Sequence, residues 1–323
     1  MTAREPYIGA DGEVRELDDD FFAKAKARRG GPIMSDIAVI GLGEMGAALA
    51  RIQLDYAYKV TVWNRTRAKA EPLQAMGAVL ADTPGKAVMA APITMICVDN
   101  YRISDALLAE AFEGGGLEGR TIIQFSTGSP HEVRKSAEWI AARGGAYLDG
   151  AIRCYPSALG TNDSPMMISG DEELFKQVVP HLTILSRDLR FVGEDIAATA
   201  ALDLALLTSS VALYAGAAHA AHICEAEGVA LAELARASRG THGGRLSELA
   251  ETIDQNAFAL NSLHSGASLS VWSKVVHRIR EQAAMAGIDA SLPEFLAGLY
   301  DKGVAAGHGD EDVAALVKAL RAD

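Results

Sequence analysis

Residues 37–46 read Ile37-Ala-Val-Ile-Gly-Leu-Gly-Glu-Met-Gly46, and this stretch decides the fold. Its first four residues are apolar and mostly β-branched, which is typical of a short buried strand. Glycines then recur as Gly-x-Gly-x-x-Gly, and a helix is expected from Glu44 onward. In this strand–turn–helix setting Gly41 allows a tight turn, Gly43 lets the backbone approach a pyrophosphate, and Gly46 permits close packing of helix on strand. The helix N-terminus attracts the anion. We therefore predict a dinucleotide-binding turn made of Gly41, Leu42, Gly43, Glu44, Met45 and Gly46.

Strands and helices continue to alternate beyond this turn. Short apolar runs predict strands, and the segments between them have helical period. The order βαβαβ predicts an α/β fold with a parallel, doubly wound sheet, and so an N-terminal Rossmann domain over residues 34–194. The expected strands are 37–40, 59–63, 79–80, 93–98, 120–125, 146–149 and 166–169, and the expected helices are 44–58, 67–76 and 130–143.

The end of the second strand selects the cofactor. An acid at this position accepts from the ribose 2′-OH of NAD, whereas an arginine accommodates the 2′-phosphate of NADP. The strand runs into Asn64-Arg65-Thr66 and has no acid there. The Arg65 guanidinium can fork onto a phosphate, and its two neighbours add neutral donors. We therefore expect NADPH, bound in part by Asn64, Arg65 and Thr66. The alternative is a solvated basic loop.

A second turn follows a later strand. Its sequence is Ser126-Thr-Gly-Ser-Pro130, at the carboxyl end of a strand, where ligands bind in open α/β sheets. Ser126 and Thr127 can hydrogen-bond a substrate. The alternative is a turn in which Ser129 only caps the next helix. We assign Ser126, with Val98 at the end of another strand, to the cofactor site and Thr127 to the catalytic residues.

The second half of the chain has helical period throughout. Residues 195–227 form one Ala- and Leu-rich run that ends at Gly228, and as a helix it would be about 50 Å long. This length exceeds the diameter of a small domain, so we assign the run as an interdomain helix. Residues 228–323 then form an all-α domain, with helices expected at 230–238, 245–257, 267–286, 291–304 and 310–321.

One acid, Asp203, interrupts the apolar start of the long helix. A buried carboxylate is costly unless it is paired or protonated, and burial moves a carboxyl group toward general-acid behaviour. We therefore expect Asp203 to be catalytic. The alternative is a solvent-facing or structurally paired acid. Tyr214 lies three turns further along the same helix face, where it would either line a pocket or pack, and we include it in the catalytic set.

Composition argues against several classes of protein. The chain has 30 basic and 42 acidic residues, a net charge of −12, which disfavours a nucleic-acid or anionic-membrane partner. Its three cysteines have no disulfide or metal spacing, which favours a cytoplasmic protein with reduced thiols. The apolar run 196–221 contains Asp203, which disfavours a membrane span. His219 and His222 lack a third ligand nearby, so no metal is expected.

Residues 1–33 differ from the rest of the chain. They are polar, with an acidic run at 16–20 and basic residues after it, and an apolar signal segment is not expected in them. We predict a mobile N-terminal extension. The stretch faintly resembles the acidic-then-basic tails of some antitoxin proteins. The alternative is that Met34 is the true initiator.

Taken together, the motifs resemble the imine reductases and reductive aminases of the β-hydroxyacid dehydrogenase superfamily. Hydroxyacid dehydrogenases hold a catalytic lysine at the position of Asp203 and an asparagine four residues later, where this chain has Leu207. Imine reductases typically hold Asp or Tyr at the first of these positions, in agreement with Asp203. The resemblance covers about residues 34–321 and rests on 41–46, Asn64-Arg-Thr66, 126–130, Tyr147-Leu-Asp-Gly150, 156–161, Ser169-Gly170 and the long helix.

The resemblance implies NADPH-dependent reduction of imines or iminium ions to amines, with Asp203 as proton donor or iminium stabiliser. It also implies a C-terminal domain like that of 6-phosphogluconate dehydrogenase, and an intertwined homodimer in which the long helix crosses to the partner. The expected substrate is a small imine or carbonyl compound. Two other functions stay open: a reductase of small aldehydes or keto acids, and an NADP-binding regulatory protein without turnover.

Overall fold

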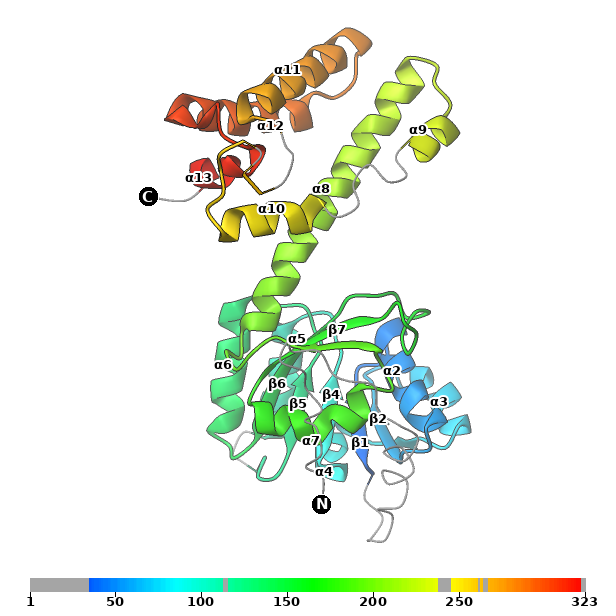
Figure 1. The fold of residues 1–323 in the computed structure, drawn as a ribbon. Coiled ribbons are helices and arrows are strands. Elements are labelled where there is room, and N and C mark those ends of the chain that lie inside the picture. Colours follow the sequence, from blue (N-terminus) through cyan, green and yellow to red (C-terminus); the bar gives the residue numbers. More distant parts are fainter. Residues whose placement is uncertain (1–34, 113–115, 238–244, 261, 264–266, 321–323) are drawn as a thin grey trace, which may run out of the picture. The chain divides into compact units, whose positions relative to one another are not determined.

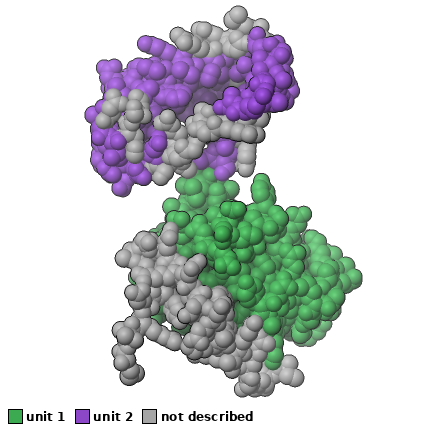
Figure 2. Space-filling model, turned by 45° about the vertical axis from the view of Figure 1, so that its right-hand side comes forward, with its two compact units in different colours: residues 1–207 green, residues 208–323 purple. Residues whose placement is uncertain are grey.

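The computed structural model describes residues 35–112, 116–237, 245–260, 262–263 and 267–320 (Figure 1). The chain divides into two compact units, residues 1–207 and 208–323 (Figure 2). This division falls within the expected interdomain helix. The expected N-terminal extension, residues 1–33, lies outside the described residues. Several side chains between residues 208 and 286 also lie outside them, including that of Tyr214.

The first unit is built around one eight-stranded sheet with the order β3-β2-β1-β4-β5-β6-β7-β8. Its strands are β1 (Ile37–Ile40), β2 (Val60–Trp63), β3 (Val79–Leu80), β4 (Ile93–Ile96), β5 (Thr121–Gln124), β6 (Ala146–Ile152), β7 (Pro165–Gly170) and β8 (Asp188–Phe191). Its helices are α2 (Glu44–Asp55), η1 (Arg67–Ala70), α3 (Glu71–Ala75), α4 (Pro84–Ala90), α5 (Tyr101–Ala111), α6 (Pro130–Ala141) and α7 (Glu172–Leu182).

Strand direction follows the prediction for most of the sheet. The strands from β3 to β6 are all parallel, which confirms a Rossmann-like α/β domain. The expectation of a wholly parallel sheet is wrong at β7, which pairs antiparallel with β6, while β8 runs parallel to β7. The physical reason is the connection. The chain between β6 and β7 forms turns and no helix, and a parallel return requires a long, usually helical, crossover.

Each face of the sheet has its own apolar core. On one face α2, α3 and α7 pack against strand residues such as Val39, Val62 and Ile123. On the other face α5 and α6 pack against Ile40 and Ile122. The alternation along each strand sends successive side chains to opposite cores. Both faces are therefore covered, and ligands approach the sheet at the carboxyl ends of its parallel strands.

Three helices and one strand were not predicted: α4, α5, α7 and β8. The three helices nevertheless begin with an ordinary capping signal. The side chains of Thr83, Asn100 and Asp171 each accept a hydrogen bond from the backbone N–H three residues later. These caps were the available sequence signal.

Helix α8 (Ala198–Ala226) begins in the first unit and is about 43 Å long, slightly shorter than expected. Strands β6 and β7 hold its first turn. The Ser169 hydroxyl accepts from the Thr199 N–H at 3.2 Å and donates to the Ile196 carbonyl at 3.0 Å. Asp149 accepts from the backbone N–H of Ala200. The start of α8 is thus fixed to the sheet by buried polar groups.

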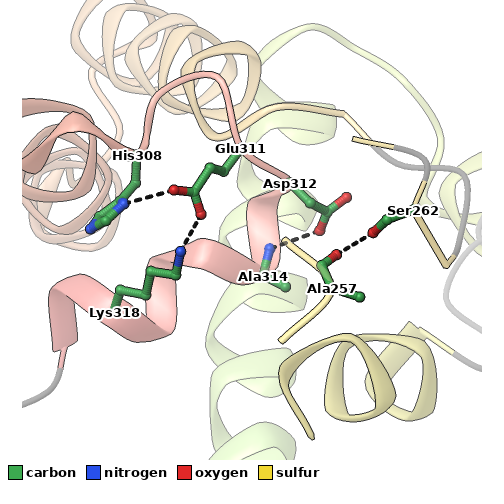
Figure 3. Close-up of polar contacts among 7 residues, drawn as sticks. All are labelled: Ala257, Ser262, His308, Glu311, Asp312, Ala314 and Lys318. Carbon is green, nitrogen blue, oxygen red and sulfur yellow. Dashed lines mark hydrogen bonds and ion pairs between the residues drawn. The ribbon is translucent and has the colours of Figure 1, made fainter. Parts of the chain in front are cut away.

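The second unit is helical, as predicted. Besides α8 it contains α9 (Leu231–Ala237), α10 (Arg245–Asp254), α11 (Leu269–Ala286), α12 (Ser291–Gly303), η2 (Val304–His308), η3 (Val313–Ala315) and α13 (Leu316–Leu320). Polar contacts hold its last segment (Figure 3). The Glu311 carboxylate contacts both Lys318 and His308, and the hydrogen bond from Lys318 lowers the pKa of Glu311. Asp312 accepts from the Ala314 N–H at 2.9 Å.

The anchoring acid predicts a pH dependence of stability. Burial raises the pKa of Asp149 to about 7; the hydrogen bonds from Tyr101 and Ala200 oppose this rise, and the charge of Asp203 adds to it. Between about pH 4 and pH 7 the folded state then holds a proton that the unfolded state has released. The contribution of Asp149 to the free energy of unfolding is therefore full below about pH 4 and is lost as the pH rises toward 7. In that pH range, the free energy of unfolding should fall with pH by up to about 1.4 kcal/mol per unit because of Asp149, and we expect Asp149→Asn to remove this slope.

The measurement is chemical denaturation of parent and variant from pH 4.5 to 8. The difference between the two is the informative quantity, because burial lowers the pKa of His181 to about 4 and gives the parent an opposing slope. The exposed Asp195→Asn serves as the control. A difference between Asp149→Asn and parent that stays constant with pH would contradict the prediction.

Candidate cofactor and active site

The predicted dinucleotide turn links β1 to α2. Gly41 has φ of +92°, in the left-handed region that favours glycine. A Cβ on Gly41 would lie 2.2 Å from the Cys97 carbonyl oxygen, and one on Gly46 would lie 1.9 Å from the Gly41 carbonyl oxygen. A Cβ on Gly43 would instead meet no described atom within 4 Å. The turn is therefore tight on its inner side and open above Gly43, at the N-terminus of α2. Leu42 is buried, Glu44 is exposed and Met45 is partly buried.

The end of β2 is tied to this turn. The Leu42 N–H donates to Asn64 Oδ1 at 2.9 Å, and Asn64 Nδ2 donates to the Thr66 carbonyl at 2.9 Å. Asn64 therefore fixes the shape of both loops, which leaves it less free to donate to a ligand. The Arg65 side chain is exposed beside it. Of these three residues, Arg65 is the one whose charge is available to a phosphate.

The ends of β4 and β5 lie next to the same turn. The Val98 N–H donates to Ser126 Oγ at 3.1 Å, and Val98 Cγ1 would lie 2.8 Å from a Cβ on Gly41. The structure thus brings together Gly41, Val98 and Ser126 from three strand ends. Ser126 is only 5% exposed, and its hydroxyl is committed to the backbone of the neighbouring strand.

Thr127 follows as an exposed residue at the edge of this group. Ser129 after it caps α6 in a capping box with Glu132, as the alternative interpretation of the turn required. Gly128 between them has a separate constraint, since a Cβ there would lie 2.2 Å from the Tyr101 ring. Among the described residues, no hydrogen bond or ion pair joins Thr127 to Asp203.

Asp203 lies in the second turn of α8 and is 9% exposed. Its Oδ1 accepts from Arg153 Nη1 at 2.9 Å. Both side chains are largely buried, at 13% and 21% exposure, which makes this the least exposed ion pair in the described part of the chain. Arg153 directly follows β6, so the pair stands at the carboxyl end of a parallel strand. Sequence reasoning allowed a paired Asp203 but did not identify the partner.

A buried polar cluster lies beside this pair. Tyr101 donates to Asp149 Oδ1 at 2.5 Å, and Tyr147 donates to the Tyr101 hydroxyl at 3.0 Å. Burial raises the pKa of both tyrosines, so they stay protonated as donors. Sequence reasoning missed Arg153, Tyr101 and the role of Asp149. The available signal was a pair of charged residues, Asp149 and Arg153, at the end of an otherwise apolar strand.

Two further expectations concern the helical half. Tyr214 belongs to α8, but its side chain lies outside the described residues, as do those of His219 and His222. Within the described part, no group of three or more His, Cys, Asp or Glu side chains could hold a metal ion. In the same part, no helix combines the length and the hydrophobicity needed to cross a membrane.

The described residues fit a dinucleotide phosphate. The open space above Gly43 admits a pyrophosphate at the N-terminus of α2, where among the described residues no side chain caps the helix. The exposed guanidinium of Arg65 suits a 2′-phosphate, and no acid competes at that strand end. The glycine turn and the end of β2 would hold the cofactor together.

Comparison with known families covers nearly the whole described chain. Residues 36–193 match the NAD binding domain of 6-phosphogluconate dehydrogenase. Residues 195–322 match the C-terminal domain of NADPH-dependent reductive aminase-like proteins. The two matches meet near the predicted boundary between the Rossmann domain and the long helix.

Individual relatives agree with the domain matches. The chain is 32% identical to the NADPH-dependent reductive aminase of Aspergillus oryzae over 289 residues, 87% of this chain and 96% of that protein. It is similar to an imine reductase from Myxococcus stipitatus in complex with NADP+, with a TM-score of 0.81 and 32% identity over 88% of this chain and 100% of the other. A reductive aminase from Aspergillus terreus in complex with NADPH and ethyl levulinate has a TM-score of 0.80 and 30% identity, covering 89% of this chain and 100% of the other.

These similarities extend over both units and confirm the resemblance drawn from the motifs. The chain belongs to the imine reductase and reductive aminase family, within the wider group of proteins like 6-phosphogluconate dehydrogenase.

Proposed function

We propose that this protein is an NADPH-dependent oxidoreductase that reduces C=N bonds to amines. The observation that carries the proposal is Asp203, a largely buried carboxylate on α8, held by Arg153 at the carboxyl end of β6, the sheet neighbour of β5. Family membership supports the same reaction. When bound, NADPH supplies the hydride for the imine carbon.

The chain's own residues bind the cofactor and stabilise charge. The turn around Gly43 and the N-terminus of α2 would hold the pyrophosphate, and Arg65 the 2′-phosphate. Asp203 forms an ion pair with Arg153, with 2.9 Å between Oδ1 and Nη1. A carboxylate in such a pair can stabilise positive charge on a substrate, so of its two candidate roles we assign Asp203 that of stabilising an iminium already protonated by solvent.

The remaining predicted residues have supporting roles. Thr127 is exposed at the end of β5 and can hydrogen-bond the substrate from there. Tyr214 is assigned to the substrate pocket on its helical position alone. Ser126 and Val98 shape the loop beside the cofactor turn.

A coupled assay tests the proposal directly. Purified protein with NADPH is expected to consume the cofactor on addition of a cyclic imine such as 2-methyl-1-pyrroline, and to form the amine. Small aldehydes and keto acids serve as comparison substrates. Faster turnover of those carbonyl compounds would favour the hydroxyacid-dehydrogenase alternative, and tight NADPH binding without turnover would favour a regulatory protein.

Cofactor choice gives a first prediction for a variant. A charge-assisted bond contributes about 1.5–3 kcal/mol, so Arg65→Ala should raise the Michaelis constant for NADPH by about tenfold to a hundredfold. The constant for NADH should change little, because NADH has no 2′-phosphate. Steady-state kinetics with both cofactors check this, with Arg67→Ala, an exposed neighbour, as control. An equal loss for both cofactors would make Arg65 structural.

Asp203→Asn tests the catalytic assignment. The amide keeps the shape but loses the charge, and leaves Arg153 as an uncompensated cation. We expect turnover of neutral cyclic imines and of permanently charged N-alkyl iminium ions to fall by at least about tenfold, while NADPH binding is retained. Unimpaired reduction of the charged substrates would instead indicate a proton-donor role. Parent rates on every imine would make Asp203 structural.

We further propose a homodimer. The helical unit has large apolar side chains at the surface of the described chain, among them Leu213 on α8, Trp272 on α11 and Phe295 on α12 at 56%, 41% and 63% exposure. A partner would remove such surface from water. Sedimentation at micromolar concentration should give about twice the chain mass, 34.0 kDa. A monomer with full activity would contradict the proposal.

A further inference from the structure

The Arg153 guanidinium has more hydrogen-bonding capacity than its partner uses. An arginine side chain offers five N–H donors in a planar fork. In the described chain, Nη1 of Arg153 donates to Asp203, and this is the side chain's only hydrogen bond. The other two guanidinium nitrogens, Nε and Nη2, have no hydrogen-bond partner among the described residues, and neither is fully shielded from solvent. They therefore open onto solvent-accessible space.

Other arginines of the first unit are used differently. Arg143 donates to two backbone carbonyls, those of Phe112 and Trp139, and lies over the Trp139 ring. Arg134 forms an ion pair with Asp195 in which both side chains are more than half exposed. Arg153 alone among these three combines a largely buried position with free donors beside a proposed catalytic acid.

We propose that Arg153 and Asp203 together recognise a substrate whose C=N carbon carries a carboxylate, that is, an imine of a 2-oxo acid or a cyclic imino acid. In such a molecule the protonated nitrogen and a carboxylate oxygen are three bonds apart. The pair presents an anion and a cation 2.9 Å apart. Asp203 faces the iminium nitrogen, and the unused edge of Arg153 takes the carboxylate through two parallel N–H donors.

Charge balance favours this zwitterionic ligand. The pair is neutral as a whole, and so is an iminium carboxylate, so the ligand adds no net charge to a partly buried site. The reaction balances without a further reactant. The iminium carbon gains a hydride from NADPH, the π electrons of C=N become the nitrogen lone pair, NADP+ is released, and the product is a 2-amino acid.

This inference rests on the proposed function, and the test separates the two. Two cyclic imines of similar size are compared with NADPH: 1-piperideine-2-carboxylate and 2-methyl-1-piperideine. The quantity measured is the ratio of their kcat/KM values. The parent should prefer the carboxylate by at least about tenfold. Arg153→Met should lower that ratio by about tenfold to a hundredfold, the range of one charge-assisted contact.

Two further variants keep the test independent of folding. Arg153→Lys retains the charge next to Asp203 but loses the fork, so it should keep only part of the preference. Arg134→Met removes a guanidinium from an ion pair elsewhere in the unit and should leave the ratio unchanged. A ratio near one in the parent, or equal losses on both imines in Arg153→Met, would overturn the inference and leave Arg153 as a positioning residue for Asp203.

Binding provides a readout that does not need turnover. With NADP+ present, calorimetry should find that the parent binds pipecolate more tightly than piperidine, and that Arg153→Met loses this difference. If neither imine is reduced, the proposed function fails, and the pipecolate measurement alone decides the carboxylate site. If both imines are reduced equally and pipecolate binds no more tightly than piperidine, the proposed carboxylate site is wrong but the proposed function stands.

Discussion

The rest of the site depends on how β6 and β7 hold the first turns of α8. Ser169 and Asp149 accept the N–H groups of Thr199 and Ala200, two of the four donors that a helix start leaves without intrahelical partners. Arg153 then reaches Asp203 in the next turn. Apolar packing alone tolerates small rotations of a helix, whereas these directional bonds define one rotation. That rotation is what places the Asp203 carboxylate at the end of β6 instead of against the apolar core.

The antiparallel turn at β7 contributes to the same arrangement. Because β7 returns beside β6, Ser169 lies directly opposite Asp149 in the sheet register. A parallel strand reached through a helical crossover would bring its opposite end to this position. The departure from the predicted sheet therefore lets two neighbouring strands present polar groups to one helix start. Gly170 next to this pair has φ of +126°, in the region that favours glycine, and a Cβ there would lie 2.9 Å from both Leu148 Cδ2 and Ile196 Cδ1.

Much of the fold could be predicted from the sequence, because the glycine turn, the short apolar strands and the long Ala-rich helix are local patterns. The φ of +92° at Gly41 is set within the turn itself, and Gly228 ends the helix region as expected, with φ of +66°. The site was harder to predict because its contacts are distant in sequence. Arg153 and Asp203 are 50 residues apart, and Tyr101 and Asp149 are 48 apart. No periodicity links such pairs, and only the folded sheet brings them together.

The ion pair also changes what a carboxylate at this helix position means. From sequence, an acid in an apolar run suggests a raised pKa and a proton donor, because burial disfavours the charge. That argument holds for Asp149, whose pKa burial does raise, to about 7, and which has only neutral donors around it. Asp203, five residues into α8, differs in its partner, because it accepts from the Arg153 guanidinium at 2.9 Å. The two buried acids are therefore distinguished by contacts that lie far away in the sequence: neutral donors where the helix begins, and a guanidinium at the carboxyl end of β6.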